Sequence, residues 1–272
     1  MPAPIVRVPR TLWRAGETSK GDRAIPEETA IAFTFNAASY AVMMATPKDL
    51  EDFAVGFAMT EGVVASPDAI DTIEIVEEDT GIELRIWLKA RDAVEFLGRR
   101  RKMAGPTGCG LCGIETLTEA MQPPPKVGAG RAYTPDQIMS AVDSLFPLQT
   151  LNRETHAVHA AGFWQPERGI VAVREDVGRH NALDKLAGAL LRESNNAADG
   201  LVILTSRVSV EMVQKSAMIG APIIVAVSAP TALAVRMAEA AGMTVVAIAR
   251  KDGFEVFTNP QRVGLKVPSS VA

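Results

Sequence analysis

The chain has 272 residues, enough for one large domain or two modest ones with a real hydrophobic core. Hydrophobic residues make up 47% and charged residues 22%, as in soluble globular proteins, and a net charge of −4 argues against nucleic acid as a partner. No apolar run approaches the roughly 20 residues that cross a bilayer, and the N-terminus lacks the apolar core of a signal peptide. We therefore expect a cytoplasmic protein without a membrane partner.

Residues 1–102 alternate short strand-like and helix-like stretches and are expected to form a smaller α+β domain. Apolar runs on either side of polar turns predict hairpins, and Thr46-Pro47 predicts a helix start, because Thr caps amides and Pro fits the first helical position. The predicted elements are a hairpin over 29–35 and 40–45, a helix from 46 to about 62, a second hairpin over 70–76 and 82–88, and a short helix over 92–101.

Residues 103–130 differ in composition, because ten of these 28 positions are Gly or Pro. Glycine permits many backbone angles and proline blocks regular hydrogen bonding, so a flexible connector is expected. Both cysteines of the chain, Cys109 and Cys112, lie in this segment.

From residue 131 onward apolar strands alternate with helices, which predicts an α/β domain over 131–272 with a parallel or mixed sheet covered on both faces. Its first helix has capping-box spacing from Thr134 to Gln137. We expect Ile138, Val142, Leu145 and Phe146 of this helix in the core. The remaining predicted strands are 169–174, 201–205, 223–227, 244–249 and 255–258, and the helices are about 179–193, 209–219 and 230–241.

In open α/β sheets, ligands bind beyond the carboxyl ends of the strands. Here those ends are rich in small, hydroxylic or cationic residues, and two lead directly into helices, whose N-termini favour phosphate. We interpret them as a nucleotide or phosphorylated-ligand site. His180, at one strand-to-helix junction, either meets ligand or serves the helix start. The four loops are 174–181, 205–209, 228–231 and 249–253.

The sequence Gly108-Cys109-Gly110-Leu111-Cys112-Gly113 places glycine on both sides of the cysteine pair. A sulfur carrier must move between donor and acceptor, which a loop without bulky side chains permits. The basic run 99–102 lies just upstream, and cations favour the nucleophilic thiolate.

Three other interpretations of the cysteine pair stay open. A thioredoxin-like redox pair should carry less glycine and open a helix, and a zinc deaminase needs a His-x-Glu motif that is absent from the chain. A structural zinc site could recruit His156 and His159 as two further ligands.

Five motifs, in order, resemble the FdhD family of formate dehydrogenase accessory sulfurtransferases. They extend the resemblance from about residue 25 to residue 262. The motifs are Ala45–Phe57, Thr107–Gly113, Glu175–Lys185, Glu211–Lys215 and Val227–Thr231.

The resemblance implies a C-terminal domain like cytidine deaminase, a three-layer α/β/α fold, without a metal ion of its own. It implies that a cysteine desulfurase loads sulfur onto Cys109, with Cys112 as its partner. Sulfur would then pass to the molybdenum, or tungsten, of a bis-molybdopterin guanine dinucleotide before insertion into the catalytic subunit of formate dehydrogenase. The family also suggests a homodimer.

The family's cofactor-binding segment matches Ile248, Ala249, Arg250, Lys251, Asp252 and Gly253. The strand-end loops add His180, Ser206, Arg207 and Ser228 to these candidate cofactor contacts. GDP is the expected mimic of the bound cofactor. Two departures add bulk near this set: Thr205-Ser206-Arg207 where Ser-Gly-Arg is expected, and His156-Ala157 where a glycine pair is expected. A cofactor-binding chaperone without sulfur transfer, and a zinc-binding module, are the alternatives.

Overall fold

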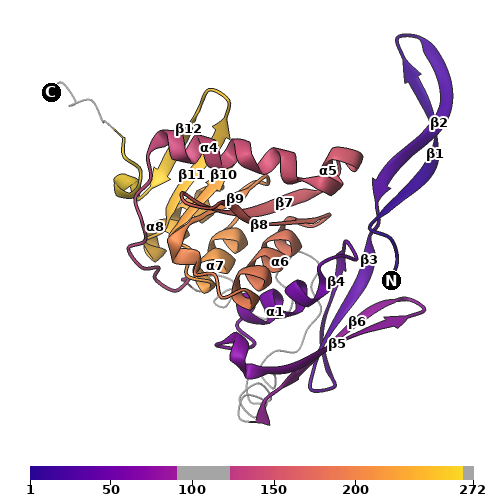
Figure 1. Cartoon of the computed structure of the whole chain (residues 1–272), viewed down its shortest axis with the longest axis horizontal. Helices are drawn as coiled ribbons and strands as arrows, with labels where there is room; N and C mark the ends of the chain where they lie inside the picture. The colour runs from indigo at the N-terminus through magenta and orange to yellow at the C-terminus, as the bar shows by residue number, and fades with distance from the viewer. Residues whose placement is uncertain (91–122, 266–272) are drawn as a thin grey trace.

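The computed structural model describes residues 1–90 and 123–265, which form sheets of two, four and six strands (Figure 1). The helix predicted over 92–101 and both cysteines lie outside the described residues. So does the predicted connector up to residue 122. Its last part, 123–130, runs along the C-terminal half, where the Arg262 guanidinium donates to the carbonyls of Gly128 and Ala129.

The two-stranded sheet is a long hairpin that the sequence patterns did not predict. Strand β1 (Ile5–Arg14) pairs with β2 (Glu17–Pro26) in ten consecutive antiparallel pairs. Ala15 and Gly16 join them with φ of 52° and 89°, the backbone of a type I′ turn. Figure 1 shows this hairpin projecting away from the rest of the molecule. We call residues 5–26 the arm.

The four-stranded sheet confirms both predicted hairpins. Its order is β4-β3-β6-β5, with a parallel β3–β6 pair at the centre. Helix α1 covers one face, where Phe33 stacks on Phe57 at 4.0 Å between ring centroids and meets Phe53 edge-on at 4.9 Å. The elements are β3 (Thr29–Phe35), β4 (Ala38–Ala45), α1 (Leu50–Thr60), the 3-10 turn η1 (Pro67–Ala69), β5 (Ile70–Glu78) and β6 (Gly81–Leu88).

The predicted start of α1 at Thr46 is wrong. The helix begins at Leu50, after Asp49 in a left-handed conformation (φ 55°). Thr46 is fully buried, and its hydroxyl accepts from the Val177 amide at 3.2 Å instead of capping its own helix. A tertiary contact made by the C-terminal half therefore replaces the local cap.

The six-stranded sheet has the order β12-β11-β10-β9-β7-β8, which confirms a mixed sheet within an α/β fold. Its central strands β9 and β10 are wholly apolar because both faces are covered, by α6, α7 and α8 on one side and by α4 on the other. Likeness to cytidine deaminases stays a prediction. The strands are β7 (His159–Gln165), β8 (Gly169–Asp176), β9 (Leu201–Leu204), β10 (Ile223–Ala226), β11 (Thr244–Arg250) and β12 (Gly253–Thr258).

Helix α4 confirms its predicted capping box, since Thr134 and Gln137 each bond the other's backbone amide. The predicted burial of Phe146 is wrong: it is 47% exposed, because α4 ends at Leu145 and a 3-10 turn redirects the chain. The remaining elements are α4 (Pro135–Leu145), η2 (Phe146–Leu148), α5 (Thr150–Thr155), α6 (Arg179–Arg192), η3 (Ala197–Asp199), α7 (Val210–Met218), α8 (Ala232–Ala241) and η4 (Pro260–Arg262).

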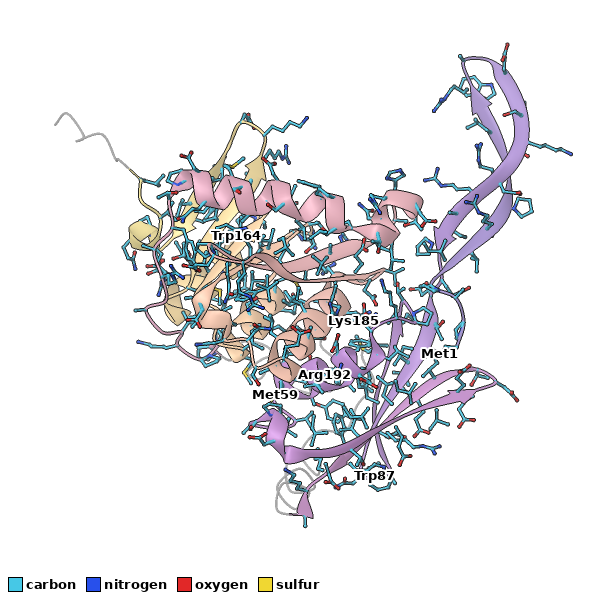
Figure 2. All side chains as sticks on the ribbon, viewed as in Figure 1. Met1, Met59, Trp87, Trp164, Lys185 and Arg192 are labelled. Atoms are coloured by element: carbon cyan, nitrogen blue, oxygen red, sulfur yellow. The ribbon has the colours of Figure 1, made fainter. Side chains whose placement is uncertain are left out.

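Helices α1 and α6 join the two halves of the molecule. They cross where Gly56 meets Asp184 and Gly188 meets Asp52. A Cβ at Gly56 would lie 1.7 Å from the Asp184 carbonyl oxygen, and one at Gly188 would lie 1.8 Å from that of Asp52. Figure 2 shows Lys185 and Arg192 of α6 directed toward α1 and the four-stranded sheet. The two halves therefore share one close-packed interface.

Candidate functional site

The predicted strand-end loops lie at one edge of the six-stranded sheet. Strand β8 runs antiparallel to β7, and β7 runs antiparallel to β9, so β8 is parallel to β9, β10 and β11. The carboxyl ends of these four strands therefore share an edge, to which the start of β7 also comes. Strand order reverses at β7, because β8 lies on one side of it and β9 on the other. Such a switch point is where α/β sheets bind ligands.

Asp176, at the end of β8, organises the first loop. It is fully buried, and its Oδ1 accepts from the Gly178 amide at 2.8 Å and from Asn181 Nδ2 at 2.9 Å. Its Oδ2 accepts from Lys185 Nζ at 2.6 Å and from the Thr46 amide at 3.0 Å. Burial lowers the pKa of Lys185, and the Asp176 carboxylate opposes that shift. The Asp176 carboxylate thus fixes the backbone at the start of α6, and it also binds the N-terminal half through the Thr46 amide.

A second buried ion pair holds α7 against the end of α1. Lys215 Nζ lies 2.9 Å from Asp184 Oδ1, 2.6 Å from Glu61 Oε1 and 3.1 Å from the Thr60 hydroxyl. Burial lowers the pKa of Lys215, but the neighbouring carboxylates outweigh it and raise that pKa overall. The middle parts of α6 and α7 are therefore tied to the C-terminal end of α1.

His180, a predicted ligand contact, faces Glu211 of α7. Nε2 of His180 lies 3.8 Å from Oε2 of Glu211, and both atoms are buried. The imidazole, aided by the Ser209 hydroxyl and opposed by burial, lowers the pKa of Glu211 to about 2. Neither atom has a hydrogen-bond partner among the described residues, and no side chain caps α6, so both roles given for His180 stay predictions. His159 lies at the same edge, where burial, then the charge of Arg179, lowers its pKa.

The second and third loops differ in how much of them solvent reaches. Ser206 is only 4% exposed and donates to the Arg207 carbonyl at 3.2 Å, whereas the Arg207 side chain is exposed. Ser228 is half-buried, and its carbonyl accepts from the Ile248 amide at 3.3 Å. Arg207 is therefore the accessible charge of these loops, and Ser228 ties the third loop to the fourth.

Residues 248–253 form the end of β11, a two-residue turn and the start of β12, a longer hairpin than predicted. Ile248 has φ of 53° beside a bulge in the β11–β12 register, a conformation that β-branched residues rarely adopt. Ala249 is fully buried. Arg250, Lys251 and Asp252 are exposed, and the bulge projects this turn beyond the sheet edge.

The proposed zinc ligands are only partly described. His156, in a left-handed conformation at the end of α5, is exposed, and His159 begins β7 three residues later. Among residues 1–90 and 123–265, no three His, Cys, Asp or Glu side chains gather as metal ligands. The same residues contain no helix long and apolar enough to span a membrane.

The sequence did not reveal the charged residues that hold this edge of the six-stranded sheet in place. Five charged residues belong to the family motifs but had no role assigned to them from the sequence: Asp176, Asp184, Lys185, Glu211 and Lys215. A polar residue inside an apolar helix repeat was the available signal: α6 buries Asn181, Asp184 and Lys185 among its leucines and alanines. Such residues are buried only when paired.

Comparison with known proteins agrees with this architecture. The sequence profile of the FdhD/NarQ family matches residues 26–264. A sulfur carrier protein FdhD from Agrobacterium fabrum is 50% identical over 258 residues, covering 94% of this chain and 95% of that protein. One from Cupriavidus necator is 44% identical over 251 residues, covering 92% and 87%.

A solved structure has the same fold. The crystal structure of a protein from Desulfotalea psychrophila, described as a formate dehydrogenase accessory protein, superposes with a TM-score of 0.74 at 26% identity. The superposition covers 96% of this chain and 100% of the chain from Desulfotalea psychrophila. The family profile and the curated relatives span nearly the whole chain, and the chain therefore belongs to the FdhD/NarQ family.

Proposed function

We propose that this protein is a sulfurtransferase that carries sulfur as a persulfide on Cys109 and delivers it to the metal of a bis-molybdopterin guanine dinucleotide. The supporting observation is its identity of 50% with a sulfur carrier protein FdhD over almost its whole length. A cysteine desulfurase is the donor, and the recipient cofactor, with molybdenum or tungsten, is destined for the catalytic subunit of formate dehydrogenase in the cytoplasm.

The transfer can be written with two thiols. The Cys109 thiolate attacks the outer sulfur of the desulfurase persulfide, whose S–S bond breaks to leave the donor thiolate. The Cys112 thiolate then attacks Sγ of Cys109 and releases hydrosulfide, which replaces an oxygen ligand of the metal. That oxygen leaves as water after protonation. The resulting Cys109–Cys112 disulfide is reduced by a cellular thiol before the next cycle.

The edge of the six-stranded sheet is the candidate cofactor site. Arg207, Arg250 and Lys251 are exposed there and can make charge-assisted hydrogen bonds to the phosphates of the guanine nucleotide arms. His180, Ser206 and Ser228 lie on the same loops. Ile248, Ala249, Asp252 and Gly253 complete the segment that the family resemblance assigns to the cofactor, and they form the hairpin that carries two of the cations.

Mass spectrometry after incubation with a cysteine desulfurase and cysteine tests the carrier role. The peptide that contains Cys109 should gain about 32 Da per sulfur atom, and Cys109→Ala should remove that gain and abolish formate dehydrogenase maturation while GDP still binds. If the loop peptide gains no mass but the nucleotide binds, the protein is a cofactor chaperone. Stoichiometric zinc in the purified protein, lost in Cys109→Ala, would favour the zinc-binding module.

A further inference from the structure

Buried polar atoms without a hydrogen-bond partner gather at the starts of α6 and α7. The described residues contain six such side-chain atoms, and four of them belong to Arg179, His180, Ser209 and Glu211. Native proteins pair nearly all of their buried polar groups, so each exception calls for a reason, of which a catalytic role is one. The four residues follow the ends of β8 and β9, so the cluster lies at the sheet edge where the cofactor is proposed to bind.

His180 and Glu211 have the arrangement of an acid and the carboxylate that orients it. The distance of 3.8 Å between His180 Nε2 and Glu211 Oε2 is longer than a hydrogen bond, and a small side-chain movement would close it. Catalytic contacts are often long before the substrate binds and tighten in its complex. Ser209 is 7% exposed, and its hydroxyl does not cap α7 but favours the ionised form of Glu211.

Positive and negative groups surround the His180 imidazole. The start of α6, Arg179 beside it and His159 of β7 disfavour a protonated ring, because like charges and the positive end of a helix dipole oppose it. Asp176 of β8 favours the protonated ring but is already engaged in the hydrogen bonds described above. Glu211 of α7, whose Oε2 has no hydrogen-bond partner among the described residues, is therefore the carboxylate that balances these charges. A histidine balanced in this way suits proton transfer, which needs an acid that gains and loses its proton with similar ease.

We propose that His180 is the acid that supplies the proton with which the oxygen ligand of the metal leaves as water, and that Glu211 positions its ring. This inference rests on the proposed function. Because Nε2 is directed at Glu211, Nδ1 on the other side of the ring is the nitrogen that reaches the cofactor. Hydrosulfide released from Cys109 brings one proton and displaces the oxygen, and the His180 imidazolium gives the second proton. Sulfide replaces oxide, so no electrons are transferred, and solvent then reprotonates His180.

Sulfur transfer in a single turnover tests this role. Cys109 is loaded by a cysteine desulfurase with radiolabelled cysteine, the desulfurase is removed, and bis-molybdopterin guanine dinucleotide with oxygen-ligated molybdenum is added. Label on the cofactor and label in free sulfide are counted separately across the pH range in which imidazole titrates. In wild type, the transfer rate should fall at high pH as His180 loses its proton. His180→Gln should slow transfer by about 10²–10⁴-fold, abolish that fall and leave the label as free sulfide.

Two further variants separate proton transfer from structural support. Glu211→Gln should slow transfer on the order of tenfold to a hundredfold, because an imidazole without its orienting carboxylate is a poorer acid. Added imidazole should restore transfer in His180→Ala, which a purely structural role of the ring would not allow. The matched control is Glu239→Gln, which changes an exposed side chain on α8 and should transfer sulfur like wild type. Circular dichroism verifies that each variant is folded.

The failure of this inference is distinguishable from that of the carrier role. Loading of label onto Cys109 should be unchanged in the His180 and Glu211 variants. If His180→Gln transfers sulfur with the rate and pH profile of wild type, or if imidazole restores nothing in His180→Ala, His180 is not the acid, and the carrier role of Cys109 stands. A wild-type protein that takes up no label, or never passes it on, would overturn the carrier role and this inference with it.

Discussion

Lys185 of α6 and Asp176 of β8 form an ion pair of 2.6 Å in which both side chains are completely buried. The pair links the first loop of the candidate site to Thr46 in the N-terminal half, because Lys185 also donates to the Thr46 carbonyl at 2.8 Å. One contact therefore determines both the start of α6 and the placement of the two halves.

Replacing Lys185 with Met should lower the free energy of unfolding by about 3–5 kcal/mol, because Asp176 would keep a buried charge without its cation. Urea denaturation measures this loss. Arg131→Met removes a cation from an exposed pair with Glu167 and is the control, for which little change is expected. Equal losses of unfolding free energy in the two variants would show that the buried Lys185–Asp176 pair contributes no more to stability than the exposed Arg131–Glu167 pair.

Replacing Gly188 with Ala should also destabilise the protein, by roughly 2–4 kcal/mol, because the new methyl group meets backbone that cannot move without separating α1 from α6. Thermal unfolding followed by circular dichroism gives the change. Gly21→Ala, on the arm, has no atom within 4 Å of the added Cβ and should leave the melting temperature nearly unchanged. An unaltered Gly188→Ala protein would contradict the close crossing.

Acid stability should depend on Glu211. Its folded pKa of about 2 is below the ordinary value of 4.5, so its stabilisation is complete above pH 4.5 and is lost as the pH falls toward 2. The shift corresponds to at most about 3 kcal/mol. Glu211→Gln should therefore show a shallower loss of stability between pH 4.5 and 2. Glu239→Gln, which changes an exposed side chain on α8, should follow wild type, and parallel curves for all three proteins would refute the low pKa of Glu211.

Nucleotide affinity should depend on the β11–β12 turn. Arg250→Ala/Lys251→Ala should weaken GDP binding, measured by calorimetry, on the order of tenfold to a hundredfold, because two phosphate-pairing cations are lost. The effect should shrink at high salt. Arg236→Ala, an exposed cation on α8, is the matched control. Unchanged affinity in the double variant would place the phosphates elsewhere.

Local signals predicted much of the fold. The capping box at Thr134 and the apolar runs of the parallel strands are specified by neighbouring residues, so the sequence indicates them directly. Strand β7 was missed because its Ala160-Ala161-Gly162 run has weak strand propensity, and only its central place in the sheet makes it a strand. The arm was missed because Glu17 to Arg23 is polar on both faces.

The candidate site was predictable to the level of loops but not of side chains. The strand-end rule located all four loops, because strand direction follows from the order of elements. Long-range contacts fixed the rest: the His180–Glu211 pair joins residues 31 positions apart, and the left-handed Ile248 occupies a position where glycine or asparagine would be expected. A single chain's local pattern contains no information on such pairings.

The crossing of α1 on α6 also constrains how this protein emerges from the ribosome. Gly56 meets a helix whose residues are synthesised some 130 positions later, so α1 keeps an uncovered apolar face until α6 leaves the exit tunnel. Contacts so distant in sequence slow folding and extend the time during which a nascent chain needs chaperones. The N-terminal half should therefore not mature ahead of the C-terminal half, and a truncated N-terminal fragment should be prone to aggregation.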